Sequence, residues 1–318
     1  MGFGALGLAT LMEPEMFSGI SAQAATSLSP LAPRQPHFPG KAKRVIHIFS
    51  QGGPSHLDTW DPKPELAKYA DKNIPLIGGT PLVSPFKFTK TGKSGVEVSE
   101  VFPRIGESID DIAVIRSMHT DIPSHEFATV LMNTGSGRLV KPSVGSWVLY
   151  GLGSENQNLP GFIALGGGLG GSQNWRSAFL PGAFQGTLVS NVSTSPEKII
   201  ENIKSHSATL PEQRDQLDLL KQLNEKHSET LNREAPLEAR IQSFELAFKM
   251  QTEATDAFDS SKEPQTIRDS YGNTDMGRRM LVARRLVERG VRFVQVWAGG
   301  WDHPQQFGNG AAPSGECG

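Results

Sequence analysis

The sequence predicts a doubly wound α/β fold built on a mostly parallel sheet, and three observations support this prediction. Short apolar runs alternate along the chain with stretches whose apolar residues recur at helical spacing. The apolar runs show no polar alternation, as expected of strands that are buried on both faces of a parallel sheet. Glycines follow several of these runs, at the points where the chain must turn.

The first elements lie between residues 44 and 118. Residues 44–49 form the first predicted strand, and Gly52 with Gly53 allows a sharp turn at its carboxyl end. Residues 80–95 are rich in Pro, Gly, Lys and Thr and predict an irregular excursion. A helix that packs on the sheet is expected over residues 98–110, and residues 112–118 predict a second buried strand.

Clearer helix signals follow. Residues 123–136 have apolar side chains at helical spacing, with Ser124 as a candidate N-cap and Gly135 as the residue that ends the helix. The stretch "VGSWVLYGL" predicts a short helix, and residues 161–165 a strand that leads into the glycine-rich loop "GGGLGGSQNW".

The remaining elements include a helical insertion. Residues from about 195 to 270 are charged and amphipathic and predict a pair of long helices, as an insertion or a cap. The stretch "DMGRRMLVARRLVERG" predicts another amphipathic helix, closed by Gly290. The strand "VRFVQVWAGGWDH" then repeats the opening arrangement, in which Gly-Gly and an Asp-His cluster follow a strand.

Composition limits the classes of function. The chain has 318 residues, 37% of them hydrophobic, and a formal net charge of −2, which is typical of a globular protein with one large core or two modest ones. Basic and acidic residues are interspersed, so we expect no nucleic-acid partner. Cys317 is the only cysteine, which excludes an intrachain disulfide and a multi-cysteine metal site and leaves the redox compartment open.

The N-terminal stretch favours export. Residues 2–11 form an apolar run that is too short to span a membrane, and Ala22-Gln23-Ala24 suits signal peptidase. No Lys or Arg precedes Arg34, so the stretch is either a signal peptide whose basic start lies upstream of Met1 or a merely apolar leader. We favour the first, with no transmembrane segment and a periplasmic or cell-envelope location. Residues 1–43, including a Pro-rich linker, are then expected to project from a domain at 44–318.

Polar clusters follow three of the predicted strands. They are residues 51–61, residues 119–126, and Asp302 with His303. Each has a structural explanation by itself, such as a helix cap or a turn. Because ligands of open α/β sheets bind beyond the carboxyl ends of the strands, we expect the clusters to converge there. Together they form an Asp/His set typical of zinc, manganese or magnesium sites.

Other catalytic templates fit less well. The loop "GGGLGG" lacks the Lys and Ser/Thr of a phosphate-binding loop, and "TGSGR" does not match the nucleophile elbow of serine hydrolases. The adjacent pair Ser55 and His56 leaves a serine hydrolase open as a weaker alternative.

The chain resembles a known family. The phrases "KAKRVIHIFSQGGPSHLDTWDPKP", "VIRSMHTDIPSHEFATVLMNTG", "QNWRSAFLPGAFQGT" and "LVARRLVERGVRFVQVWAGGWDH" are similar to exported bacterial proteins of domain-of-unknown-function family 1501, often labelled sulfatase-like. The resemblance runs from about Pro36 to His303. That family is placed in the alkaline phosphatase-like superfamily. The resemblance therefore implies a sheet of that type, a twin-arginine signal and metal-assisted hydrolysis of sulfate or phosphate esters.

The resemblance also implies roles for particular residues. Counting back from Thr134-Gly135 places His125 at the nucleophile position, between Ser124 and Glu126, so a formylglycine sulfatase mechanism is unsupported. The implied ligands of a divalent zinc, calcium, magnesium or manganese ion are Asp302, His303, His119 and Asp58. The implied substrate-binding residues are Gly52, Gly53, Ser55 and His56. Gln51 stands where the superfamily has its first metal carboxylate, and Pro304 replaces a second histidine of the family signature.

Two hypotheses follow. The resemblance ends after His303, so we expect the C-terminal part of the fold to be missing and this chain to have little or no activity. Its full-length relatives would be exported hydrolases of small-molecule or polysaccharide esters of sulfate or phosphate. The rival is a non-catalytic binding or structural protein of the cell envelope. The retained His and Asp clusters favour the enzyme, whereas Gln51 and the missing nucleophile favour the rival.

Overall fold

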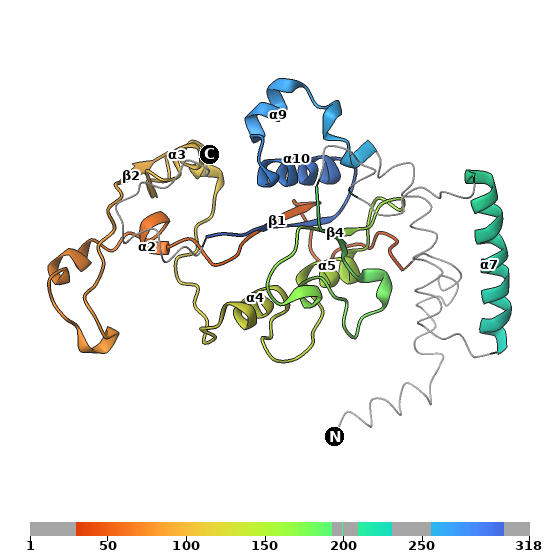
Figure 1. The fold of residues 1–318 in the computed structure, drawn as a ribbon, viewed down its shortest axis with the longest axis horizontal. Helices are drawn as coiled ribbons and strands as arrows, with labels where there is room; N and C mark the ends of the chain where they lie inside the picture. The colour runs from red at the N-terminus through yellow and green to blue at the C-terminus, as the bar shows by residue number, and fades with distance from the viewer. Residues whose placement is uncertain (1–29, 193–198, 200–208, 231–255, 302–318) are drawn as a thin grey trace, which may run out of the picture.

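A parallel sheet lies at the centre of the computed structural model, which describes residues 30–192, 199, 209–230 and 256–301 (Figure 1). The four strands have the order β1 (Val45–Ser50), β6 (Phe293–Ala298), β4 (Phe162–Leu165) and β5 (Thr187–Val189). Each neighbouring pair is parallel, with Val45 opposite Phe293 and Ile163 opposite Thr187. The predicted α/β class with a mostly parallel sheet is therefore confirmed.

Helices cover both faces of this sheet. In Figure 1, α10 (Asp275–Glu288) and α9 (Gln265–Tyr271) lie on one side, and α4 (His125–Thr134) and α5 (Val144–Leu152) lie on the other. Successive side chains of β6 point to opposite faces of the sheet, so β6 contributes to the core on both sides. Val294 and Val296 join Val282 and Leu286 of α10 in one buried cluster. In a second cluster, Phe293 and Trp297 pack with Leu149 of α5 and with Phe162.

A buried polar contact fixes α4 beneath β6. The side-chain amide of Gln295 donates a hydrogen bond to the Asn133 Oδ1 atom over 2.6 Å, and both residues are buried. Such a bond is costly to break because the partner would remain buried without a replacement. It sets the helix that begins at His125 in a defined register against the central strand.

The sequence predicts that the first strand is buried on both faces, but β1 is partly exposed. Among the described residues it pairs only with β6, so it is an edge strand. Ile48 is 46% exposed, and Val45 and Ile46 are also exposed. The apolar run predicted the strand correctly, but a run of this kind does not reveal whether a second partner lies alongside.

Two predictions between residues 98 and 118 are wrong. Residues 98–110 do not form one helix: β2 (Phe88–Thr91) and β3 (Val96–Ser99) make an antiparallel hairpin, followed by the single turns α3 (Pro103–Gly106) and η5 (Ile109–Asp111). Residues 112–118 form no strand, and Ile115 is 68% exposed. The apolar pattern is typical of a strand, but no strand among the described residues lies alongside to accept its hydrogen bonds.

The hairpin belongs to a small lobe, residues 56–118, at one end of the sheet (Figure 1). Its other helical turns are α2 (His56–Thr59), η3 (Pro64–Tyr69) and η4 (Pro75–Ile77). Trp60 packs on Phe102 with ring centroids 5.4 Å apart, and Phe102 lies 6.4 Å from Trp301, which follows β6. These rings connect the lobe with the carboxyl edge of the sheet.

Several local predictions are confirmed. α4 follows Ser124 and ends at Gly135, whose φ of 75° is the left-handed conformation that favours glycine. α5, β4, α10 and β6 lie where the sequence predicts them. The remaining described turns are η6 (Gly171–Asn174), η7 (Gly182–Phe184) and η8 (Ser260–Lys262). In the expected insertion, α7 (Leu210–Thr230) is a long helix, and residues 231–255 lie outside the described part of the chain.

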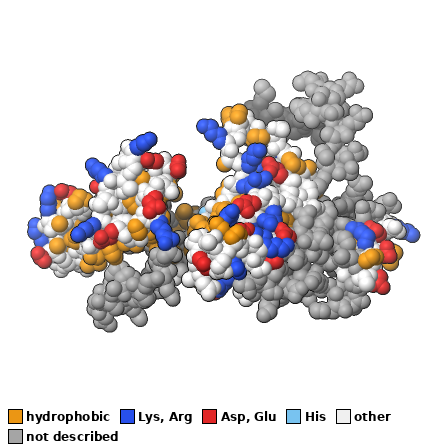
Figure 2. Space-filling view, turned by 90° about the horizontal axis from the view of Figure 1, so that it is seen from above, with side chains coloured by type: hydrophobic (Ala, Val, Ile, Leu, Met, Phe, Trp, Pro, Cys, Tyr) orange, Lys and Arg blue, Asp and Glu red, His pale blue; other side chains and the backbone are white. Residues whose placement is uncertain are grey.

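The distribution of charged side chains and the character of the helices agree with what the sequence predicts. On the side of the molecule that carries α9 and α10, Figure 2 shows basic and acidic side chains interspersed over the described residues. None of the described helices has both the length and the apolar character needed to cross a membrane. Residues 1–29 lie outside the description, but the linker after them is in contact with the domain, since the amide of Ser154 donates to the Leu31 carbonyl over 2.8 Å.

Candidate functional site

The glycine-rich loop after β4, residues 166–170, is the centre of the candidate site. Gly166 and Gly170 have φ angles of 80° and 81°, which side chains rarely adopt. A Cβ atom on Gly168 would lie 2.2 Å from the indole ring of Trp297. Glycine is therefore required at these positions, both for the backbone conformation and for the close approach to β6.

Gln51 joins this loop to the end of β1. Its Oε1 atom accepts a hydrogen bond from the Leu169 amide over 3.1 Å. The backbone amide of Gln51 donates to the Ala298 carbonyl over 2.8 Å, so Gln51 also holds the end of β6. The turn after it contains Gly52 and Gly53, with φ angles of 92° and 77°. The carboxamide at the position of an expected metal carboxylate thus has a structural partner.

Arg279 brings a positive charge to the same loop. Its Nη1 atom donates to the Trp297 carbonyl over 3.0 Å. The guanidinium lies against Gly166, where a Cβ atom would be 2.9 Å from Nη1. Within the described part of the chain, no carboxylate forms an ion pair with Arg279. A guanidinium has five N–H donors, so this group can still bind an oxyanion.

The start of α4 lies at the other end of the loop. A Cβ atom on Gly170 would lie 3.7 Å from the Glu126 carbonyl oxygen and 2.5 Å from Val130. Ser124 has an extended backbone and makes no side-chain cap, but its carbonyl accepts from the Ala128 amide over 2.8 Å. The side chains of Ser124, His125 and Glu126 are exposed. The three residues predicted to be catalytic therefore stand at the carboxyl edge of the sheet.

The turn predicted to bind substrate begins the small lobe. The amides of Trp60 and Asp61 both donate to the His56 carbonyl, over 3.0 and 2.8 Å, and Ser55 and His56 are exposed. No hydrogen bond joins the Ser55 hydroxyl to the His56 imidazole, so the structure does not build the alternative dyad. The hydrogen bond from Lys63, over 2.6 Å, lowers the pKa of Asp61.

Those expected metal ligands that the structure describes do not form a metal site. His119 is exposed and Asp58 lies in α2, whereas Asp302 and His303 fall outside the described part of the chain. Among the residues that the structure describes, no three His, Cys, Asp or Glu side chains form a group that fits a metal ion. The described residues alone therefore do not fit the implied metal, and its binding stays a prediction that depends on Asp302 and His303.

One loop thus contacts three separate parts of the sheet edge: Arg279 at Gly166, Gln51 at Leu169 and the start of α4 at Gly170. Chemically, this edge combines a guanidinium and exposed imidazole, carboxylate and hydroxyl groups. Sequence reasoning missed Arg279 and the structural role of Gln51. The only signal for Arg279 was its place at the start of a helix that precedes a strand, and that helix contains several other arginines.

Comparison with known proteins identifies a family but no activity. The family described as "Protein of unknown function (DUF1501)" matches residues 42–314. The match includes β1, the glycine-rich loop, α4 and α10. No curated protein and no solved structure matches the chain significantly. Any assignment of chemistry must therefore come from the residues themselves.

Proposed function

The chain belongs to the DUF1501 family, and from this premise we propose that the carboxyl edge of its sheet is the substrate site of an exported sulfatase-like or phosphatase-like hydrolase. The substrate class is a sulfate or phosphate ester of a small molecule or a polysaccharide. The observation that carries the proposal is the glycine-rich loop, residues 166–170, which joins Arg279 to the start of α4. A doubly wound sheet binds its ligands at this edge.

Arg279 recognises the charged group of the ester. A guanidinium matches the geometry of two oxygens on a sulfate or phosphate, and its bonds to an anion are stronger than neutral hydrogen bonds. Gly166 allows this approach because it places no side chain between the backbone and the guanidinium. Arg279 therefore contributes to binding of both the ester and the inorganic product.

His125 and Glu126 supply the groups for proton transfer. Water attacks the sulfur or phosphorus atom, the bond to the leaving oxygen breaks, and the leaving alcohol gains the proton that the water has lost. An imidazole or a carboxylate at the start of α4 is suited to accept and return that proton. A divalent ion held by Asp302 and His303 would act as a Lewis acid.

One observation favours a non-catalytic binding protein instead. Gln51 is neutral and its carboxamide oxygen is engaged by the Leu169 amide, so the edge lacks a carboxylate where related hydrolases would hold a metal. The same site would then bind an anionic group without cleaving the ester. Both alternatives use Arg279, and they differ only in turnover.

The experiment compares hydrolysis and binding in matched variants. Hydrolysis of 4-nitrophenyl sulfate and 4-nitrophenyl phosphate is measured with added zinc, calcium, magnesium or manganese, and binding of inorganic sulfate and phosphate is measured by calorimetry. Arg279→Gln should weaken anion binding about tenfold or more, which corresponds to the loss of a charge-assisted contact. Arg278→Gln is the matched control, because Arg278 pairs with Asp275 and the Asn273 side chain.

The outcomes separate the alternatives. Turnover that falls in Arg279→Gln and His125→Asn but not in Arg278→Gln supports the hydrolase. Anion binding that depends on Arg279, without turnover of either ester under any metal in this chain and in its full-length relatives, overturns the hydrolase in favour of the binding protein. Anion binding that is unchanged in Arg279→Gln contradicts the assignment of this edge as the site.

A further inference from the structure

An exposed aromatic surface lies on the outer side of α5, away from the glycine-rich loop. It consists of Trp147, Tyr150 and Phe179, which are 44%, 41% and 69% exposed. The ring of Trp147 lies 5.8 Å from the ring of Tyr150 and 5.8 Å from that of Phe179, centroid to centroid. Beneath them, Tyr150 packs on the buried Phe184. Trp147 thus contacts both of the other rings, and contiguous exposed apolar groups of this kind often mark a binding surface.

The backbone beside this surface is strained. Ala178 has a φ of 52° and is the one non-glycine residue with a positive φ in the described part of the chain. An alanine in this conformation costs free energy that the surrounding structure must supply. The next residue, Phe179, exposes its ring beside Trp147. Strained backbone of this kind is found most often at binding and catalytic sites.

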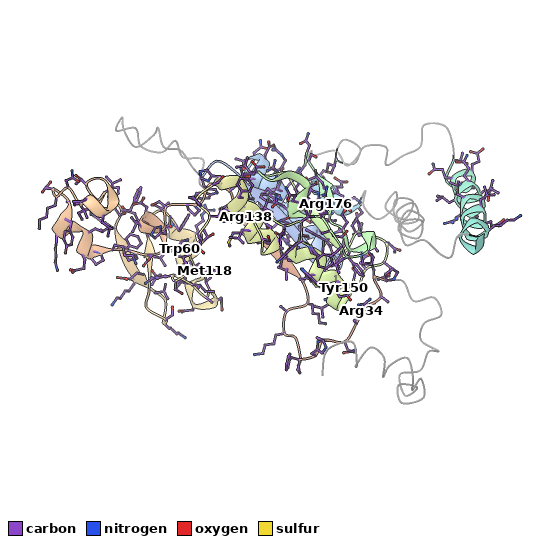
Figure 3. All side chains as sticks on the ribbon, turned by 90° about the horizontal axis from the view of Figure 1, so that it is seen from below. Arg34, Trp60, Met118, Arg138, Tyr150 and Arg176 are labelled. Carbon is purple, nitrogen blue, oxygen red and sulfur yellow. The ribbon has the colours of Figure 1, made fainter. Side chains whose placement is uncertain are left out.

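Basic side chains border the aromatic surface. Arg34 lies over the Tyr150 ring at 5.7 Å and donates to the Tyr150 carbonyl over 2.7 Å. Arg176 is exposed, and its carbonyl accepts from the Ser143 amide at the start of α5. Figure 3, which looks at the α4–α5 side, shows Arg34 beside Tyr150, and Arg138 and Arg176 on the same side of the sheet.

Acidic residues are nearly absent from this part of the chain. Between Glu126 and Glu197 the sequence contains one acidic residue, Glu155, although the whole chain has 33 among its 318 residues. Glu155 forms an ion pair with Arg44, over 2.9 Å. The stretch of chain that carries the aromatic surface therefore has few carboxylates, and Arg34 and Arg176 border the rings, so the surface suits a ligand that is both ring-shaped and negatively charged.

We propose that the aromatic surface of Trp147, Tyr150 and Phe179, with its bordering arginines, binds an anionic polysaccharide such as a sulfated glycan. Sugar rings stack their C–H faces on the exposed aromatic rings, and the guanidinium groups of Arg34 and Arg176 bind the sulfate oxygens. The three rings are not among the groups of the candidate site at the carboxyl edge, so the proposal does not depend on hydrolysis there.

Charge density favours a glycan over a nucleic acid. Duplex DNA carries one negative charge per about 1.7 Å of its axis, and proteins that bind it commonly make six to ten phosphate contacts. The surface is bordered by Arg34 and Arg176, and the chain as a whole has a net charge of −2. Few cations and several aromatic rings match a polymer of lower charge density, in which stacking supplies much of the affinity.

The test uses polymers that share a backbone and differ in charge. A sparsely sulfated dextran sulfate and unsulfated dextran are immobilised, and binding of the full chain is measured by biolayer interferometry over a range of salt concentrations, with single-stranded oligothymidylate as a third ligand. We expect dextran sulfate to bind best and with a shallow salt dependence. Phe179→Ala and Trp147→Ala should each weaken its binding about tenfold, the loss expected for one stacking ring.

A matched control is available in the small lobe. Tyr69 is also an exposed ring with a cation above it, because Lys72 lies 5.3 Å from its centroid, but Glu65 and Asp71 are close in sequence. Tyr69→Ala should bind dextran sulfate like the unmodified chain. Thermal unfolding of each variant shows whether it is folded, and Phe179→Ala is the safest because that ring is the most exposed.

Each outcome either supports or overturns the proposal. Selective loss of dextran sulfate binding in the Phe179 and Trp147 variants supports it. Absence of binding to dextran sulfate, or equal losses in all three variants, overturns it. Tighter binding to oligothymidylate than to dextran sulfate would identify a nucleic-acid surface instead. Self-association that Phe179→Ala abolishes, without polymer binding, would identify an interface between copies of the chain.

Discussion

At the residue scale, Gln51 shows how a position can be used for structure rather than chemistry. Its side chain and backbone together hold the loop after β4 and the end of β6, through Leu169 and Ala298. A carboxylate could accept the same hydrogen bond from Leu169, but it would add a negative charge near Arg279. A neutral acceptor keeps the guanidinium available for an external anion.

Asp256 gives a residue-scale prediction about pH. Hydrogen bonds from Lys262 and then from Arg289 lower the pKa of this carboxyl to about 2. A lowered pKa in the folded state stabilises the protein above the pKa of the unfolded chain, and this stability is lost as the pH falls from about 4 towards 2. Because the side chain is 43% exposed, solvent screening reduces the effect to about 1 kcal/mol or less.

Asp256→Asn should therefore lower the free energy of unfolding at pH 7 by up to about 1 kcal/mol, and the difference from the unmodified chain should vanish near pH 2. Urea unfolding at a series of pH values measures both quantities. Asp71→Asn is the control, because Asp71 makes no ion pair among the described residues. A difference that stays constant from pH 7 to pH 2 would show that the ion pairs do not stabilise the fold.

At the element scale, α5 approaches the sheet closely because one of its glycines faces β4. A Cβ atom on Gly145 would lie 2.6 Å from the ring of Phe162, which is fully buried. Gly151, on the same helix, has no atom within 4 Å of the corresponding position. Gly145 therefore allows close packing of α5 on β4, whereas the position of Gly151 has space for a side chain.

Alanine at these two positions should change stability in opposite directions. Gly145→Ala should destabilise the protein by about 1–3 kcal/mol, because the helix or the Phe162 ring must move. Gly151→Ala should stabilise it by up to about 1 kcal/mol, because alanine loses less backbone entropy in a helix. Equilibrium unfolding in urea provides both values. Equal effects of the two substitutions would mean that α5 does not pack on β4 in this register.

Helices were easier to predict than strands because their signals are local. The limits of α4 follow from Ser124 and Gly135, and those of α10 from its apolar periodicity and Gly290. A strand is stable only if another strand pairs with it, and the partner lies far away in the sequence. Residues 112–118 have the composition of a strand but pair with no strand in the described part of the chain. Pro103 and Gly106 limit the helix before them to one turn.

At the scale of the whole molecule, the turn after β1 and the start of α4 meet at the glycine-rich loop, as the sequence predicts, but Arg279 joins them without having been predicted. The turn after β1 and the start of α4 were predicted from glycines and polar clusters that follow strands. Arg279 was not, because it reaches the loop only through the packing of α10 on β6, which brings its guanidinium to the Trp297 carbonyl. Contacts of this kind depend on tertiary geometry that a pattern of residue types does not contain.

Among the described residues β1 has one unpaired edge, and this property of the sheet carries the last prediction. Edge strands with exposed apolar side chains tend to pair with another chain, and Ile46 and Ile48 project from the same face of β1. We expect concentration-dependent self-association, measured by analytical ultracentrifugation, that Ile48→Lys reduces, because a charge on an edge strand opposes pairing while its stem remains over the apolar surface. Leu76→Lys, at an exposed position of η4 outside the sheet, should leave the association unchanged. If both lysine variants associate to the same extent, or if the unmodified chain remains monomeric at every concentration, the edge of β1 is protected in solution by a feature other than charge.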